Sequence, residues 1–328
     1  ATRLGRLERR RRAVDDRYDP ARALAGAARY LAIAERRLGR EDLAAASYHM
    51  GIGNLGQVID AYVAPRPPAP TTRATVARYG LSYARLYFDS SPVRNPRTHR
   101  TLTHFGDDSR HYLFRLEAAR EIRRLHAEDP EELRRLAALH AAKASGEEAL
   151  RPRADNPPLE DADALRDAYA GGELVHLPND PRRLGFGVDP QMGALAAQVR
   201  ADRRLYRGLR PDALACLLFI AKEVHRIAGR ARLVVTSTVR DLPYQRLLSL
   251  GNPEATADFS LHTTGWAIDV LRDLPTRREE RALVHVLERL RALHVLDWVY
   301  EPAAIHLTVG PDAERLRPLL DALVPEAA

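Results

Sequence analysis

The sequence has a single cysteine, two tryptophans and no long apolar run. The lone Cys216 excludes an internal disulfide, and its apolar neighbours predict a buried side chain. No run approaches the roughly 20 apolar residues of a membrane-spanning helix, so we expect no membrane span. No signal peptide is visible, and the first residue is Ala1. We therefore expect that a leader has been removed or that the chain is cut from a longer one.

Lysine is almost absent, because Lys143 and Lys222 are the only two. The net charge of +7 and the isoelectric point of about 9.7 therefore come from arginine. A basic surface suits nucleic acid, but it equally suits an anionic polymer such as a cell wall. No nucleic-acid-binding motif is present, so we expect no nucleic-acid partner.

A chain of 328 residues is long enough for two domains, and its 45% hydrophobic and 29% charged residues are ordinary for a soluble globular protein. Residues 1–150 are rich in Ala, Leu, Arg and Glu, with apolar positions at helical spacing, which predicts an all-helical domain. Helices are expected over 72–87 and 109–126. The segment APRPPAP, residues 64–70, predicts a surface loop because proline ends helices.

The composition changes from residue 151 onward. Residues 151–190, rich in Pro, Asp and Gly, are expected to link the two domains. Residues 191–328 alternate helical and β-branched segments, which predicts an α+β domain. The expected helices cover 211–228, 244–250 and 275–293, and the expected strands cover 232–239, 266–270 and 298–309.

The stretch SLHTTGWAIDV, residues 260–270, places His262 and Asp269 seven positions apart with small residues between them. These small residues let the chain turn from a loop into a strand, so that both side chains face one point. His and Asp are zinc ligands, and a catalytic zinc site typically has three protein ligands and an open position. His306 on a neighbouring strand is the candidate third ligand. Glu301, five residues upstream of it, is the candidate general base.

Arg240 ends the expected strand over 232–239. Its guanidinium is always charged and forks onto two oxygens, so it is a candidate to hold a substrate carboxylate or the oxyanion of a tetrahedral intermediate. Together, TSTVRDLPYQ, SLHTTGWAID and WVYEPAAIHLTV resemble the zinc D-alanyl-D-alanine peptidases (M15-like), whose fold is shared with the hedgehog signalling domain. The family pattern S-x-H-x-x-G-x-A-x-D is matched by Ser260, His262, Gly265, Ala267 and Asp269.

The resemblance implies a hedgehog/DD-peptidase-like zinc domain in the C-terminal part of the chain. The implied Zn²⁺ ligands are His262, Asp269 and His306. The resemblance further implies that Glu301 is the catalytic base and that Arg240 stabilises the developing charge. Ser260 and Gln245 are expected to contact the substrate. The spacing from Glu to His is wider than the three-residue step of the dipeptidases and is closer to the hedgehog arrangement.

Each of these residues alone has an ordinary structural interpretation. A histidine at a strand end is usually hydrogen-bonded, and a lone aspartate is usually a helix cap. Their occurrence together, in order and on the expected elements, favours a metal site. The histidines His225, His285 and His294 occupy helical positions without paired ligands, and we expect them to be surface or packing residues.

The segment AARYLAIAERRLGREDLAAASYHMGIGNLGQVIDAY, residues 27–62, resembles the second half of a lytic transglycosylase (SLT) domain of lysozyme-like fold. In that family a Y-L helix precedes an A-Y-N-x-G turn that lines the glycan groove. The turn is matched by Tyr48, Gly51, Gly53 and Asn54, with His49 where the family usually has Asn. The resemblance implies that Tyr48, Gly51 and Asn54, with Tyr112 on a later helix, contact the glycan.

Glycan cleavage of this type needs a carboxylic acid in an apolar pocket. The family's glutamate lies in an E-S motif before the Y-L helix, and residues 1–26 contain no such motif. Glu8 stands in RLERRRR, a solvated charge run. Two interpretations stay open. Either the chain begins after the catalytic glutamate, which we favour, or the domain is a degenerate glycan-binding module.

These features predict a two-domain peptidoglycan hydrolase, with a zinc peptidase acting on the stem peptide and a lysozyme-like region engaging the glycan. The alternative is a non-catalytic cell-wall binding protein with a structural zinc. Peptidoglycan is the expected partner, and an extracytoplasmic location follows from that substrate. We expect a monomer.

Overall fold

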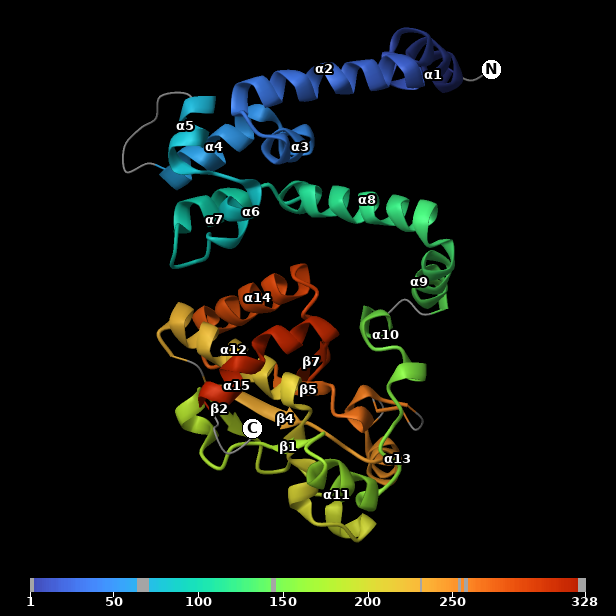
Figure 1. Cartoon of the computed structure of the whole chain (residues 1–328), viewed down its shortest axis with the longest axis vertical. Coiled ribbons are helices and arrows are strands. Elements are labelled where there is room, and N and C mark those ends of the chain that lie inside the picture. The colour runs from blue at the N-terminus through green and yellow to red at the C-terminus, as the bar shows by residue number, and fades with distance from the viewer. Residues whose placement is uncertain are drawn as a thin grey trace. The chain divides into compact units, whose positions relative to one another are not determined.

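The fold of the chain is given by a computed structural model (Figure 1). It describes residues 3–63, 71–142, 146–230, 232–252, 255–256 and 259–323, so the loop expected over 64–70 lies outside the described residues. The chain divides into two compact units, Ala1–Asp129 and Pro130–Ala328. It is mostly helical, with a small mixed sheet in the second unit. No helix within the described ranges has the length and apolarity needed to cross a membrane.

Helices form the regular structure of the first unit wherever it is described. They are α1 (Arg3–Val14), α2 (Pro20–Leu38), α3 (Glu41–Met50), α4 (Ile52–Val63), α5 (Arg73–Tyr79), α6 (Tyr83–Phe88), α7 (Pro96–His104) and α8 (Tyr112–Glu128), with the 3₁₀ helices η1 (Asp16–Tyr18) and η2 (Asp108–His111). The all-helical character expected for this region is therefore confirmed.

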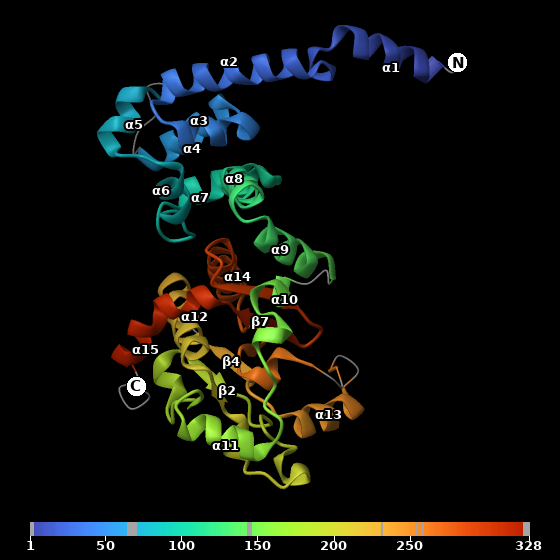
Figure 2. The same cartoon turned by 45° about the vertical axis from the view of Figure 1, so that its right-hand side comes forward.

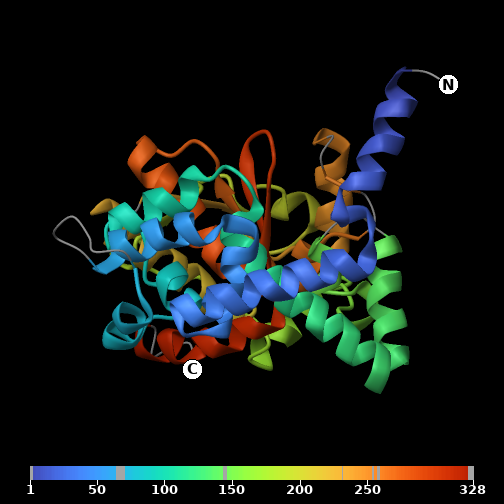
Figure 3. The same ribbon diagram turned by 90° about the horizontal axis from the view of Figure 1, so that it is seen from above.

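Local signals in the sequence set the ends of α2. Asp19 accepts hydrogen bonds from the backbone N–H groups of Ala21 and Arg22, and Pro20 occupies the first helical position. Gly39 ends the helix in the left-handed conformation, with φ of 77°. The short η1 separates α1 from α2, and Figure 3 shows the bend between these two helices.

The core of the first unit joins α2, α3, α4 and α6. Its fully buried side chains include Leu38, Ile59 and Tyr83. The single helix expected over 72–87 is instead two helices, α5 and α6. The reason is local, because Gly80 takes the left-handed conformation with φ of 57° after α5, and Ser82 caps α6.

The second unit contains two sheets. The strands are β1 (Val175–His176), β2 (Phe186–Val188), β3 (Gly208–Leu209), β4 (Leu233–Ser237), β5 (Ala267–Leu271), β6 (Leu296–Tyr300) and β7 (Ala304–Val309). The larger sheet has the order β2-β4-β5-β7-β6, and β1 pairs with β3 in a smaller one. The pair β2–β4 is parallel and the other pairs are antiparallel, so the larger sheet is mixed.

The second unit also contains helices. They are α9 (Pro130–Ala142), α10 (Gly146–Leu150), α11 (Ala162–Ala170), α12 (Pro211–Ala228), α13 (Leu242–Gly251), α14 (Arg277–Ala292) and α15 (Arg317–Leu323), with the 3₁₀ helices η3 (Arg153–Asp155), η4 (Pro181–Leu184), η5 (Ala196–Val199), η6 (Arg203–Tyr206), η7 (Leu261–Thr264) and η8 (Pro311–Leu316). The helix expected over 211–228 is present as α12. Figures 1 and 2 show α12 and α14 on one side of the strands and α11 and α13 on the other.

Along β5 and β7, side chains that enter the core alternate with side chains on the opposite face of the sheet. Ile268, Val270 and Leu307 are buried in the core that α12 and α14 complete, and Cys216 of α12 is buried there as expected. Successive side chains of a strand point to opposite faces. The residues that alternate with them on β5 and β7 therefore face away from this core.

Residues 151–190 differ from the expected linker, because they are an integral part of the second unit. They contain α11, β1 and β2, and β2 pairs with β4 over residues 186–188. Leu165, Leu174 and Phe186 are buried, so short apolar stretches of this segment are part of the core. The Pro and Asp residues between them form turns and helix caps. The division between units falls after Asp129 rather than near residue 150.

The strand expected over 298–309 is instead a hairpin of β6 and β7, with Trp298 opposite Leu307. Glu301 and Pro302 lie in its turn. Proline cannot donate a ladder hydrogen bond, which is why the extended run ends there.

Replacing Phe186 by alanine tests whether the 151–190 segment is part of the fold. The side chain is 1% exposed, and removing it should lower the free energy of unfolding by about 3–5 kcal/mol, as for other buried phenylalanines. The matched control Arg183→Ala removes an exposed side chain from the same segment and should change stability by less than about 0.5 kcal/mol. Urea unfolding measures both. Equal midpoints for the two variants would mean that the segment behaves as a linker.

Candidate metal centre

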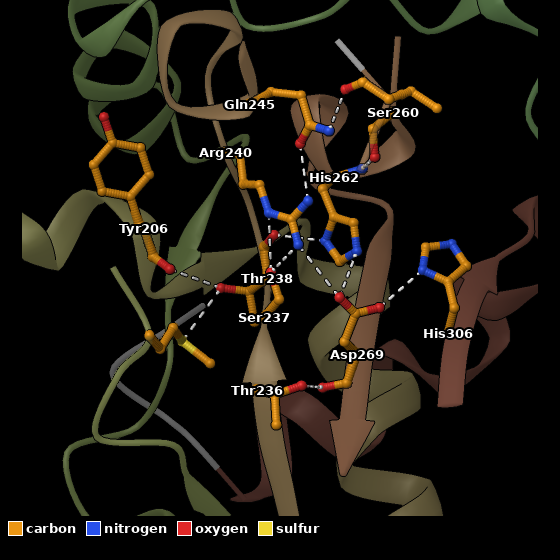
Figure 4. A network of polar contacts seen from close by, with 12 residues as sticks. Tyr206, Thr236, Ser237, Thr238, Arg240, Gln245, Ser260, His262, Asp269 and His306 are labelled. Atoms are coloured by element: carbon orange, nitrogen blue, oxygen red, sulfur yellow. Dashed lines mark hydrogen bonds and ion pairs between the residues drawn. The ribbon is translucent and has the colours of Figure 1, made fainter. Parts of the chain in front are cut away.

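The candidate metal ligands on the strands lie in one row across the larger sheet. Asp269 of β5 is the register partner of His306 of β7, and His306 is also opposite Val299 of β6. Ser237 of β4 is opposite Asp269 on its other side. Directly opposite residues project from the same face of a sheet, so the register brings these side chains together (Figure 4).

His262 reaches the same row from η7. The Ser260 hydroxyl caps this 3₁₀ helix by accepting a hydrogen bond from the His262 backbone N–H at 3.4 Å. Gly265 ends η7 with φ of 81°, and a Cβ there would lie 2.8 Å from Cδ2 of Leu174, so the turn into β5 requires glycine. As a result, one ligand atom from each of His262, Asp269 and His306 lies within 4.8 Å of the other two.

A backbone contact sets the orientation of the His262 ring. Nδ1 lies 2.8 Å from the carbonyl oxygen of Thr238, which can only accept, and this places the proton on Nδ1. Nε2 lies 3.0 Å from Oδ2 of Asp269. Burial, together with the charge of Arg240, lowers the pKa of His262.

His306 approaches Asp269 from the other side. Its Nδ1 lies 2.8 Å from Oδ1 of Asp269, and its Nε2 lies 3.7 Å from Oε1 of Glu147. Burial lowers the pKa of His306, but the interactions with Asp269 and Glu147 outweigh it and raise the pKa to about 10. Burial likewise raises the pKa of Asp269, yet His262 and His306 lower it far below its ordinary value. The carboxylate is therefore ionised.

Glu147 is a site residue that the sequence analysis does not identify. It lies on α10, far upstream of the motif segments. Two adjacent glutamates, here Glu147 and Glu148, are common in the first turn of a helix and do not by themselves indicate a site. The tight packing of α10 against β6 brings it to the site, since a Cβ at Gly146 would overlap the carboxylate of Asp297. No spacing rule relates Glu147 to His306, so only the fold places it there.

Arg240 is buried, and its guanidinium is bound within the site. Nε and Nη2 donate to the Ser237 hydroxyl at 3.1 and 2.7 Å, and Nη2 lies 3.3 Å from Oδ2 of Asp269. Nη1 donates to Oε1 of Gln245 at 2.8 Å. Gln245 is itself buried, and its Nε2 donates to the Thr256 carbonyl at 2.8 Å. Burial lowers the pKa of Arg240, and Asp269 opposes that effect.

The row of ligands borders a cavity of about 380 Å³. Besides the ligands and Ser260, its walls include Glu147, Glu148, Arg240, Gln245 and Glu301. Glu301 follows β6 directly, where its backbone N–H donates to the Ala304 carbonyl at 2.9 Å. It comes two positions after Val299, which opposes His306, and so continues the same face of the sheet. The structure thus brings all five motif residues to one place.

The donor set fits a zinc ion. Two imidazole nitrogens and one carboxylate oxygen are zinc ligands, and the cavity leaves a fourth position open. One ligand atom from each of the three residues lies within 4.8 Å of the others, which is close enough for a single ion to contact all three. The Thr238 carbonyl and the Glu147 carboxylate face the outer ring nitrogens, which is the usual arrangement around zinc-binding histidines.

In the first unit, Tyr48 and Tyr112 meet in an aromatic cluster. Tyr48 stacks with Tyr112 at 6.2 Å between ring centroids and packs edge-on against Tyr30 at 5.6 Å. His49 stacks on Tyr112 at 5.2 Å and hydrogen-bonds through Nδ1 to the Ser109 hydroxyl at 2.9 Å. Tyr48 is 46% exposed, so the cluster presents ring surface to the solvent.

The turn between α3 and α4 positions this cluster. Gly51 has φ of 89°, a conformation that favours glycine. The Tyr30 hydroxyl donates to the Ser47 carbonyl at 2.6 Å and accepts from the Ile52 N–H at 3.1 Å, which ties the preceding helix to both sides of the turn. The Asn54 side chain donates to a backbone carbonyl of α3 at 2.9 Å. Gly51 and Asn54 thus shape the turn.

Comparison with known proteins finds a family likeness in the first unit. Residues 2–65 match the family model of the transglycosylase SLT domain. Searches of curated proteins and of solved structures find no match. The peptidase resemblance of the second unit stays a prediction. The N-terminal region of the chain, residues 2–65, is thus similar to a transglycosylase SLT domain, in agreement with the resemblance expected for this region.

Proposed function

We propose that the protein is a peptidoglycan hydrolase, in which the second unit is a zinc-dependent peptidase for the stem peptide and the first unit engages the glycan. The observation that carries the proposal is the convergence of His262, Asp269 and His306 beside a cavity that also contains Glu301 and Arg240. Three ligands with an open side are typical of a catalytic zinc. An extracytoplasmic location and a monomeric state are part of the same proposal.

In this proposal His262, Asp269 and His306 hold the ion, which supplies Lewis-acid chemistry when bound. Glu301 accepts a proton from the attacking water and passes it to the leaving amine, the role of a general base and acid. Its place in the turn after β6, on the cavity wall, lets its carboxylate reach a substrate in the cavity.

Arg240 stabilises the negative charge that develops on the substrate. A guanidinium has five N–H donors, and its four hydrogen bonds to Ser237, Gln245 and Asp269 leave one Nη1 hydrogen for a substrate oxygen. Gln245 acts by positioning Arg240, since its amide is committed at both ends. Gln245 also lines the cavity, so its expected contact with substrate stays a prediction.

The aromatic cluster of the first unit supports glycan binding rather than cleavage by this region. Tyrosine offers an apolar ring face and a polar tip, which suits a sugar ring with its hydroxyl groups. Glu8 is not placed to act as the general acid, because its exposed side chain pairs with Arg12 at 3.2 Å. A general acid of this type needs an apolar pocket.

The second candidate function is a non-catalytic cell-wall binder with a structural zinc. The observation that favours it is burial, since His262, Asp269 and His306 are only 2%, 7% and 7% exposed. Structural zinc sites are closed, whereas catalytic sites keep an open position. The two candidates differ in whether Glu301 is needed.

The first prediction concerns zinc and turnover. The protein should contain one zinc per chain and release products from purified stem peptides. His262→Ala should lose both zinc and cleavage, whereas His294→Ala, which removes an exposed histidine outside the site, should keep both. Glu301→Gln should keep zinc and lower kcat at least about 100-fold, the scale of a lost general base. Glu314→Gln is its matched control. Metal analysis and product chromatography measure these outcomes.

The outcomes separate the two candidates. Zinc with no cleavage of any stem peptide, and with wall binding intact in Glu301→Gln, would establish the binding protein. A chain that takes up no zinc would overturn the site.

The second prediction concerns Glu147. Because its carboxylate orients His306 from the outer nitrogen, Glu147→Gln should weaken zinc binding about tenfold, the lower end of the effect of such partners. Glu148→Gln makes the same change of charge one residue along α10 and should have a smaller effect. Competition with a chromophoric chelator measures both affinities. Equal losses in the two variants would indicate a general charge effect instead of a contact with His306.

The third prediction concerns the aromatic cluster. Tyr112→Ala removes the ring on which both Tyr48 and His49 stack, and it should weaken binding to purified glycan strands about tenfold, or about 1.4 kcal/mol. Tyr79→Ala removes an exposed tyrosine outside the cluster and should leave binding unchanged. Co-sedimentation with glycan strands measures both, with circular dichroism as a check of folding. Unchanged binding by Tyr112→Ala would exclude this surface.

A further inference from the structure

The second unit has another cavity, of about 1110 Å³, that shares no lining residue with the metal-site cavity. It lies along β2, the edge strand of the larger sheet. Its lining contains one aspartate, Asp180, and five arginines: Arg182, Arg203, Arg204, Arg207 and Arg232. The two cavities thus have opposite charge, since carboxylates dominate the walls of the metal-site cavity.

Two of the five arginines have protein partners. Arg203 donates to the backbone carbonyls of Met192 and Pro190, and Arg232 pairs with Glu279 at 3.2 Å. Across the part of the chain that the structure describes, the guanidinium groups of Arg182, Arg204 and Arg207 form no ion pair. Three like charges around one cavity repel each other unless an anion lies between them.

Two buried polar atoms at this cavity also lack a partner. Nε of Arg207 and Nδ1 of His176 are buried and have no hydrogen-bond partner among the described residues. The Arg207 Nε–H is always a donor, so it is satisfied only by an acceptor from outside the fold. The His176 ring is held against Tyr169, with ring centroids 4.0 Å apart. Unsatisfied buried polar groups are rare in native proteins and call for a ligand or an ordered water.

We propose that this cavity binds a multiply charged oxyanion, which Arg204 and Arg207 hold with the help of Arg182. Guanidinium groups match phosphate and carboxylate in a bidentate geometry and discriminate poorly between them. The volume exceeds that of ordinary small-ligand pockets, about 300–1,000 Å³, so the site accommodates several linked anionic groups rather than one small ion. This proposal does not depend on zinc or on peptidase activity.

Calorimetric titration of the full chain with pyrophosphate and, separately, citrate tests the site. The protein is first dialysed against a chelator and returned to chelator-free buffer at 150 mM salt, so that neither probe acts through a bound metal. Arg204→Gln and Arg207→Gln should each weaken binding at least tenfold. Arg226→Gln removes the same charge from an arginine of α12 that pairs with Glu223 at 2.6 Å, and it should bind as the unaltered chain does.

Each outcome has a defined meaning. Binding of pyrophosphate alone identifies a phosphate ligand, binding of citrate alone identifies a carboxylate ligand, and binding of both supports the shared oxyanion chemistry. The absence of binding by either probe, or an equal loss in all three variants, overturns the proposal, because the second result would reflect net charge alone. Since Arg207 is partly buried, its variant is checked by thermal unfolding, and the exposed Arg204 keeps the test decisive if Arg207→Gln fails to fold.

Discussion

The second unit is organised around one buried carboxylate. Asp269 is 7% exposed, and a buried ion is tolerated only when it is paired and hydrogen-bonded. Three groups meet this requirement: His262 at 3.0 Å, His306 at 2.8 Å and Arg240 at 3.3 Å. They come from η7, β7 and the segment that follows β4, so all three must be in place for Asp269 to remain charged. Removing that charge would leave Arg240 and the imidazoles without their common partner, and the row across the sheet would lose its centre.

The chemistry of the site depends on how the sheet separates its two faces. The alternation that directs Ile268 and Val270 into the core also directs Asp269 to the opposite face, so the helix layer of α12 and α14 makes the site rigid without entering it. Contacts behind the ligands then set their orientation. Thr238 and Glu147 face the outer nitrogens of the histidines, and Ser237 and Gln245 hold Arg240. The side chains that line the cavity therefore have few alternative rotamers.

A feature of the fold or of the site was predictable from the sequence when neighbouring residues determine it. The helix over 211–228 is predictable from the helical periodicity of its own residues. The turn that brings His262 beside Asp269 is predictable from the small residues around Gly265. Pairing between residues far apart in the chain is only weakly visible in the sequence. The segment around Phe186 reads as a linker because its strand is only three residues long, and a single strand was expected where Pro302 divides a hairpin. Glu147 was not predictable at all, since the packing of α10 on β6, rather than any spacing, brings it to His306.

The two histidines are oriented by different kinds of acceptor, and this has a consequence for how the site can change over evolutionary time. His262 is held by the main-chain carbonyl of Thr238, an atom that every amino acid supplies, so no replacement at position 238 deletes it. His306 is held by the side chain of Glu147, which a single codon change can shorten, neutralise or remove. The acceptor of His262 is thus insensitive to the side chain at its position, while the acceptor of His306 offers natural selection a graded adjustment of the ring that leaves His262, Asp269 and His306 in place.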